Sequence, residues 1–80
     1  MRYVYLMRSV RRPERKYIGI TSDLQARLEE HNEGKSRFTR GGGPWQIVVA
    51  VRFRDHKRAE EFEAYLKSGS GHAFARRHLW

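Results

Sequence analysis

The sequence predicts an α+β fold whose elements follow the order β-β-α-β-α-α, and three observations lead to this prediction. Runs rich in aromatic and β-branched residues stand near the start and in the middle of the chain, as is typical of strands. Later segments have apolar residues at helical spacing, and clusters of Gly, Ser and Pro separate the segments. Because 80 residues suffice for one core, we expect a single domain over residues 1–80.

The first two strands are predicted to form a hairpin. Residues 3–7 and 17–21 are rich in Tyr, Val and Ile, whereas residues 11–15 between them contain Pro13 among basic side chains. A break of this kind between two strand-forming runs predicts a hairpin with a basic loop.

The first helix is expected over about residues 23–32. Ser22 followed by Gln25 is the pattern of a capping box, and Gly34 is a typical residue just beyond a helix end. The next ten residues, 35–44, include three consecutive glycines that we expect to form a flexible connector.

A third strand is predicted over residues 45–53, which have a continuous apolar centre, and Asp55 is placed to cap a second helix. The apolar residues at core spacing in this helix are Ala59, Phe62 and Leu66. The Ser-Gly-Ser-Gly tract at 68–71 is predicted to end it. The residues expected in a short third helix are Ala73, Phe74 and Leu79.

Three polar side chains fall on the predicted inner faces of the helices. Because successive helical residues advance by about 100°, Arg27 and His31 share a side of the first helix with its leucines, and Glu63 faces inward on the second. An unpaired buried carboxylate costs several kcal/mol, whereas an exposed helical pair of Glu63 with Lys67 contributes only about 0.3 to 0.5 kcal/mol. Glu63 therefore needs a metal ion, a cation such as Arg27, or a cleft open to water.

Each of these residues also has a purely structural interpretation. Arg27 can pair with an acidic neighbour on its own helix, and His31 can simply pack against the sheet. Tyr5 and Tyr17 lie on adjacent predicted strands, where a cross-strand aromatic pair is stabilising. The coincidence of two strand tyrosines with an inward Arg, His and Glu favours the functional interpretation, because a phosphodiester-cleaving site needs those residue types.

The charge of the chain favours an anionic partner. The formal net charge is +8, and thirteen of the seventeen cationic residues are Arg, whose planar guanidinium binds phosphate oxygens two at a time. Stretches with few acids attract polyanions through counterion release, although a merely solubilising surface is the alternative. The residues we expect to contact nucleic acid are Arg11, Arg12, Lys16, Lys35, Arg37 and Arg40.

Two features exclude other classes of protein. The longest apolar run is residues 47–51, far short of the roughly twenty residues that a membrane span needs. The chain has no Cys, which excludes a disulfide framework and a thiolate metal site. We therefore expect a cytoplasmic protein that binds nucleic acid and no membrane.

Several segments together resemble one nuclease family. Tyr3-Val4-Tyr5 followed about ten residues later by Tyr17-Ile18-Gly19 resembles the paired motif of the GIY-YIG nucleases. Residues 23–32 resemble the first helix of that family, with Arg27 at the position of its active-site arginine. Residues 59–71 resemble the helix with the metal-binding glutamate, here Glu63. The chain is thus similar to small stand-alone members and to the N-terminal nuclease domain of the excinuclease of excision repair.

The resemblance implies a three-stranded antiparallel sheet flanked by helices, with both tyrosines beside the site. It implies hydrolysis of a DNA phosphodiester with one Mg²⁺ or Mn²⁺ ion held by Glu63. Arg27 would stabilise the pentacovalent phosphate, and Tyr5 and Tyr17 would position or deprotonate the nucleophile, aided by His31. Arg27 and the metal are expected to lower the pKa of whichever tyrosine acts as the base.

The chain departs from the family pattern in two places. Tyr3 stands where the family name has glycine, and residues 68–80 contain no asparagine, which several family nucleases place near the site. With no added DNA-binding domain expected, cutting should be structure-selective, on DNA rather than RNA, as in DNA repair, by a monomer or weak homodimer. The alternatives are a non-catalytic nucleic-acid-binding module on the same fold and a protein-interaction adaptor that uses Phe74 and Trp80.

Overall fold

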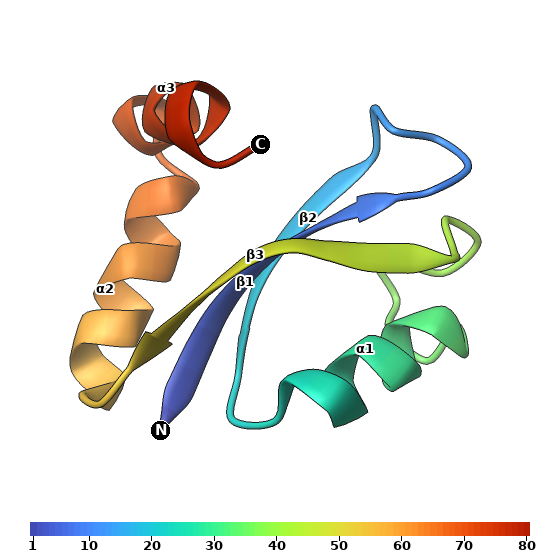
Figure 1. The fold of residues 1–80 in the computed structure, drawn as a ribbon, viewed down its shortest axis with the longest axis horizontal. Helices are drawn as coiled ribbons and strands as arrows, with labels where there is room; N and C mark the ends of the chain where they lie inside the picture. Colours follow the sequence, from blue (N-terminus) through green and yellow to red (C-terminus); the bar gives the residue numbers. More distant parts are fainter.

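A three-stranded antiparallel sheet and three helices make up the computed structural model, which describes all residues 1–80 (Figure 1). The strands are β1 (Arg2–Ser9), β2 (Lys16–Thr21) and β3 (Trp45–Phe53), in the sheet order β2-β1-β3. The helices are α1 (Leu24–Asn32), α2 (His56–Leu66) and α3 (Gly69–His78). The predicted order and the antiparallel sheet are confirmed. None of the three helices has the length and apolar composition of a membrane span.

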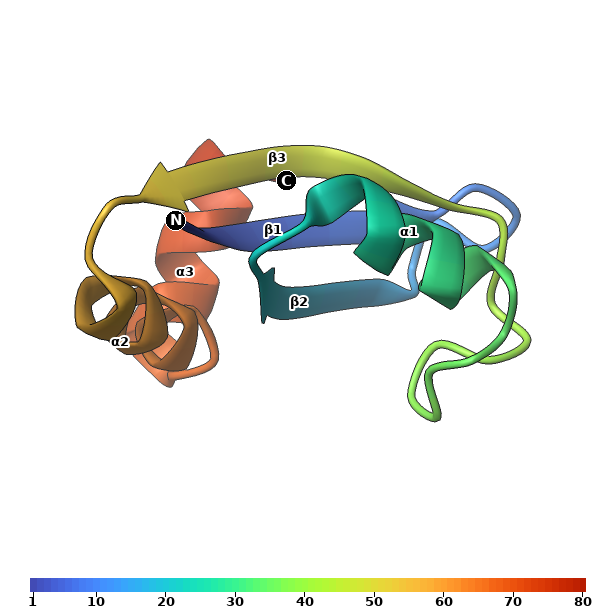
Figure 2. The same ribbon diagram turned by 90° about the horizontal axis from the view of Figure 1, so that it is seen from below.

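The central strand β1 divides the core into two layers. Val4 and Leu6 are fully buried in the cluster that includes residues of α2 and α3, whereas Tyr5 and Met7 pack with side chains of α1. This alternation follows from the two-residue period of a strand. Figure 2 shows α1 in front of the sheet and α3 behind it, so the helices cover opposite faces. The aromatic layer under α1 holds the two tyrosines that the sequence singled out.

The pairing of β1 with β2 brings these tyrosines together over a glycine. Tyr5 pairs with Gly19, and Met7 pairs with Tyr17. A Cβ atom on Gly19 would collide with the phenol of Tyr5 and lie 2.9 Å from Cε2 of Tyr17. Gly19 therefore gives both rings the space they occupy.

Helix α1 begins at a different cap from the one predicted. Its N-cap is Asp23, whose carboxylate accepts the amide N–H of Ala26 at 3.1 Å, so the capping box from Ser22 is wrong. The Thr21 hydroxyl accepts the N–H of Asp23 at 3.1 Å, which helps to hold Asp23 extended and delays the helix by one residue. Gly34 has a positive φ of 77°, as expected just beyond a helix end.

The second and third helices meet more closely than the sequence suggested. Asp55 caps α2 as predicted, but the tract 68–71 does not separate the helices, since Ser68 caps α3 and Gly69 begins it. A Cβ on Gly71 would collide with the carbonyl of Tyr65, so glycine allows α3 to pack directly against the end of α2. The inward side chain of α3 is Ala75, whereas that of Phe74 is 36% exposed.

Candidate active site

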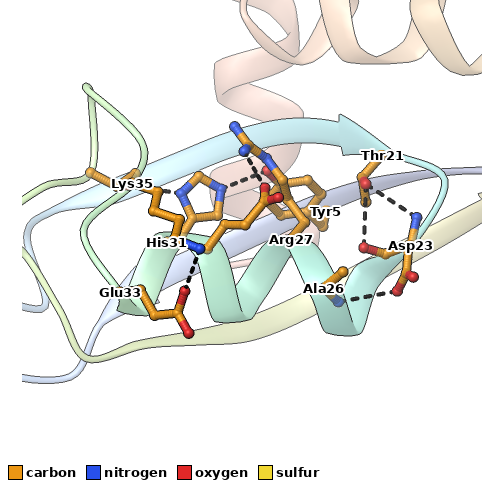
Figure 3. A network of polar contacts seen from close by, with 10 residues as sticks. Tyr5, Thr21, Asp23, Ala26, Arg27, His31, Glu33 and Lys35 are labelled. Atoms are coloured by element: carbon orange, nitrogen blue, oxygen red, sulfur yellow. Dashed lines mark hydrogen bonds and ion pairs between the residues drawn. The ribbon is translucent and has the colours of Figure 1, made fainter.

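A buried chain of hydrogen bonds joins β1, α1 and the loop at 35–44 (Figure 3). Tyr5 Oη lies 2.8 Å from His31 Nε2, and His31 Nδ1 lies 2.7 Å from Thr39 Oγ1. All three residues are at most 2% exposed. Both ring nitrogens of His31 therefore have a partner, and the imidazole is fixed in one orientation.

Thr39 is the member of this chain of hydrogen bonds that the sequence did not assign to the site. It lies in the loop at 35–44, whose three glycines were expected to form a flexible connector, and no periodicity marks it. The only sequence feature that distinguishes Thr39 is its position directly before Arg40 and the three glycines of the loop. The loop is anchored, because the Trp45 indole N–H donates to the Thr39 carbonyl at 3.0 Å and Gly42 is buried.

Burial sets the protonation states of the two central groups. Removal from water lowers the pKa of His31 from 6.5 to about 4, helped by the positive charge of Arg27. Burial also raises the pKa of Tyr5 from 10.0 to about 12, although Arg27 acts in the opposite direction. The expected net lowering of a tyrosine pKa by Arg27 is therefore not found for Tyr5, because desolvation outweighs the neighbouring cation.

Arg27 reaches both the site and its own helix. Its Nη1 donates to Glu30 Oε1 at 2.8 Å, which is the structural pairing expected as an alternative and the main reason that the pKa of Arg27 is raised. Figure 3 shows the same side chain next to Tyr5 and His31. The side chain of Arg27 is 32% exposed, and the guanidinium has five N–H donors, so most of them remain for a ligand.

Tyr17 completes the group from the edge strand β2. Its ring centroid lies 5.1 Å from that of His31, edge-on, and 6.3 Å from that of Tyr5. Unlike Tyr5, Tyr17 is only half-buried. The cross-strand aromatic pair and the cluster with His31 thus coexist, and Tyr17 is the tyrosine that solvent can reach.

Glu63 stands apart from these four residues. It lies on α2, its side chain is 22% exposed, and Oε2 accepts a hydrogen bond from Lys67 Nζ at 3.4 Å. It makes no hydrogen bond to the other predicted site residues, but its negative charge is close enough to raise the pKa of Tyr5. The structure therefore joins Tyr5, Tyr17 and His31 in direct contacts and places Arg27 beside them. Glu63 lies within electrostatic range of Tyr5.

The side chains around Glu63 fit a metal ion that takes only one of its ligands from the protein. No group of three or more His, Asp or Glu side chains converges anywhere in the structure. Mg²⁺ commonly takes one or two carboxylates and completes its octahedron with waters and substrate phosphate oxygens. Because Oε1 of Glu63 has no protein partner, this single carboxylate fits such an arrangement.

The six cationic residues expected to contact nucleic acid are all exposed. Two of them have protein partners, since Lys35 pairs with Glu33 at 3.0 Å and Arg40 donates to the Gly34 carbonyl at 3.0 Å. The remaining four form no ion pair with an acid, and their charge is available to a polyanion.

Comparison with known proteins identifies the family. The GIY-YIG catalytic domain model matches residues 1–75. The chain belongs to the GIY-YIG family. A UPF0213 protein of Clostridium perfringens is 35% identical over 68 residues, which cover 84% of this chain and 71% of that protein. The structure-specific endonuclease subunit SLX1 of Candida dubliniensis is 37% identical over 83 residues, which cover 95% of this chain and 28% of that protein.

A solved structure of a relative agrees with the fold. The solution structure of a UPF0213 protein from Bacillus halodurans matches 96% of this GIY-YIG chain and 82% of its own, with a TM-score of 0.57 and 29% identity. The chain thus spans most of the UPF0213 proteins but little more than a quarter of the SLX1 protein. Membership of the GIY-YIG family and similarity to a structure-specific endonuclease support nuclease activity.

Proposed function

We propose that this protein is a divalent-metal-dependent endonuclease that hydrolyses phosphodiester bonds in DNA and selects its substrate by structure. The main support is the contact cluster of Tyr5, Tyr17, Arg27 and His31 in a chain of the GIY-YIG family. Similarity to the structure-specific endonuclease subunit SLX1 of Candida dubliniensis supports structural selectivity.

In this proposal Arg27 binds the phosphate that is attacked. Its guanidinium stays protonated, since the pairing with Glu30 raises its pKa. A phosphate can reach the exposed part of the guanidinium without breaking the pairing with Glu30. Arg27 then stabilises the extra negative charge that develops on the pentacovalent phosphate.

The two tyrosines have different tasks. With a pKa of about 12, the Tyr5 phenol keeps its proton at neutral pH. Its O–H donates a hydrogen bond to Nε2 of the neutral His31. His31 Nδ1–H then donates to Thr39 Oγ1, which fixes the tautomer. Tyr17, half-buried beside the same imidazole, is left to orient the attacking water.

Glu63 would hold the metal ion, Mg²⁺ or Mn²⁺, through the carboxylate oxygen that has no protein partner. When bound, such an ion supplies a positive charge that offsets the charge of the phosphate oxygens. Glu63 also keeps Lys67 close to the site through their pairing.

Cleavage of labelled branched DNA with Mg²⁺ or Mn²⁺ tests the proposal. We expect Arg27→Gln and Glu63→Gln to lower kcat/KM by about a hundredfold or more, because each removes a charge that acts on the transition state. Glu61→Gln is the matched control, since Glu61 is exposed on the same helix as Glu63. Equal rates for Glu63→Gln and Glu61→Gln would disprove the metal assignment.

The same assay separates the enzyme from a binding module. Tight, salt-sensitive binding of branched DNA by the wild-type protein without cutting under either metal would show that the scaffold only binds. Faster cutting of RNA than of DNA of the same shape would contradict the assignment of DNA as the substrate.

A further inference from the structure

A cleft of about 310 Å³ opens at the free edge of β2, beside the candidate active site. One wall is β2, and the other comes from the end of α2, from α3 and from the C-terminal residue. Figure 1 shows the chain returning from α3 toward the sheet at this point. The lining includes Lys16, Tyr17, Lys67, Arg76 and Trp80. Because Tyr17 belongs to both the cleft and the catalytic cluster, an occupant of the cleft lies next to the reacting groups.

The lining of the cleft combines positive charge with aromatic surface. It includes Lys16, Lys67 and Arg76 but no Asp or Glu. Lys67 pairs with Glu63, whereas Lys16 and Arg76 form no ion pair with an acid. The hydrophobic residues of the lining are Tyr17, Ile18 and Trp80. Ile18 and Trp80 pack with the core layer of α2 and α3, and Tyr17 packs with the layer of α1.

The indole of Trp80 is held in place by its neighbours. Lys16 Nζ lies 5.1 Å and Arg8 Cζ lies 5.5 Å from the centroid of its ring, within the range of cation–π attraction. The Trp80 amide N–H donates to the Ala75 carbonyl at 2.9 Å, and the side chain packs against the core. A preorganised aromatic wall next to free cations suits a ligand better than a merely solubilising surface would.

The ligand that fits this lining is flat at one end and anionic at the other. A nucleotide has that form, because its base stacks on aromatic side chains and its phosphate pairs with Lys and Arg. The volume is at the lower limit for small-molecule pockets, which suits one nucleotide.

We propose that this cleft binds one unpaired nucleotide of the strand that is cut, with its base on Trp80 and its phosphate on Lys16 and Arg76. The inference rests on the proposed nuclease function and specifies its substrate. A base that is still paired is stacked inside the duplex, so it must leave the stack before it can lie on this wall. The preferred substrate is therefore DNA with an unpaired nucleotide adjoining the cleaved phosphodiester.

Binding can be measured without cutting, using Glu63→Gln protein in the absence of metal. Fluorescence anisotropy is recorded with a duplex that has a single-stranded overhang and with the same duplex blunt-ended. On this background, Arg76→Gln should weaken overhang binding about tenfold, because a charged hydrogen bond to phosphate is lost. The matched control is Arg77→Gln, which removes the same charge from the same helix outside the cleft.

The comparison between these two variants decides the proposal. Blunt duplex should bind equally well to both. Equal weakening of overhang binding by Arg76→Gln and Arg77→Gln would show that only overall charge matters and would overturn the proposal.

The aromatic wall has its own test. Trp80→Leu should weaken overhang binding about tenfold, and Trp80→Phe should preserve most of it, because stacking needs a ring. Thermal unfolding checks that both variants fold, and the Arg76 comparison remains decisive if Trp80→Leu does not. A 5′-mononucleotide should compete with the overhang better than inorganic phosphate does, and equal competition would contradict base recognition.

Cleavage assays separate a failure of this inference from a failure of the proposed function. If the wild-type protein cuts branched DNA and the Arg76 and Arg77 variants bind alike, the protein is a nuclease without this nucleotide site. A protein that shows the Arg76 effect but never cuts has the nucleotide site without the nuclease function.

Discussion

Burial, more than any neighbouring charge, determines the protonation of Tyr5 and His31. Arg27 adds to the effect of burial at His31 and opposes it at Tyr5, yet the pKa of each moves in the direction that favours the neutral form. The phenol and the imidazole are therefore both neutral at pH 7, so the phenol O–H can donate to the unprotonated ring nitrogen. This explains why a high pKa at Tyr5 is compatible with a role in the site.

The low pKa of His31 predicts a specific dependence of stability on pH. Between pH 6.5 and about pH 4 the unfolded chain protonates this residue and the folded protein does not, so stability falls as the pH is lowered through this window. The loss due to His31 approaches about 3 kcal/mol at its lower end. Urea unfolding of wild type and His31→Gln at several pH values should show a steeper decline for wild type. Parallel curves would contradict the assigned burial.

The tight packing around Gly19 predicts that a substitution there impairs cleavage in protein that is still folded. Gly19→Ala places a methyl group against Tyr5 and Tyr17, so both rings must shift. We expect stability to fall by about 1 to 3 kcal/mol and kcat/KM to fall by more than tenfold in protein that is still folded. Single-turnover cleavage and circular dichroism measure the two effects, and unchanged cleavage by the folded variant would show that the tyrosine geometry is not required.

At the level of helices and loops, helix ends and loop anchors position the site. Asn32, at the end of α1, accepts the amide N–H of Trp45 at 2.6 Å and donates to its carbonyl at 3.3 Å. These bonds tie α1, and with it Arg27 and His31, to the start of β3. Residues 68–80 contain no asparagine, and Asn32 on α1 has this structural role instead of a place near the C-terminus.

The contact between α2 and α3 predicts opposite effects for two glycines of one helix. Gly71→Ala would place Cβ against backbone atoms, including Leu66 Cα at 2.6 Å, which cannot move without shifting the helix. We expect a loss of about 2 kcal/mol or more in the free energy of unfolding. Gly69→Ala is the control, because its Cβ meets nothing within 4 Å, and it should be neutral or slightly stabilising. Chemical denaturation measures both, and equal effects would refute the close contact.

Across the molecule, the net charge of +8 is divided between two uses. Exposed cations without acidic partners, such as Arg11 and Arg12, can hold a nucleic-acid backbone at many positions. Arg27 and the cations of the cleft act at defined places next to the tyrosines. Affinity and substrate choice are therefore expected to respond differently to salt and to mutation.

The salt dependence of DNA binding tests the general part of this charge. The double variant Arg11→Gln/Arg12→Gln should lower the slope of log K against log salt by about two if each residue contacts one phosphate. Arg54→Gln/Arg58→Gln removes the same charge from exposed residues at the start of α2 and should change the slope less. Equal slopes for the two double variants would show that the hairpin loop is not a specific contact.

Local patterns in the amino-acid sequence were enough to predict the order of the elements, the bounds of β3, the cap of α2 and the inward direction of His31. These features follow from local chemistry, because periodicity and capping act over a few neighbouring residues. The metal-binding role of Glu63 stays a prediction.

The way in which these parts meet depends on tertiary packing. Thr39 joins the site because its loop is anchored at Trp45, and α3 begins within a Gly-Ser tract because Gly71 lies against the backbone of α2. The cleft beside Tyr17 likewise forms from residues far apart in the chain. Such contacts depend on packing between distant segments, which no local pattern encodes. They place the hydrogen-bonded His31 and the cleft on either side of Tyr17.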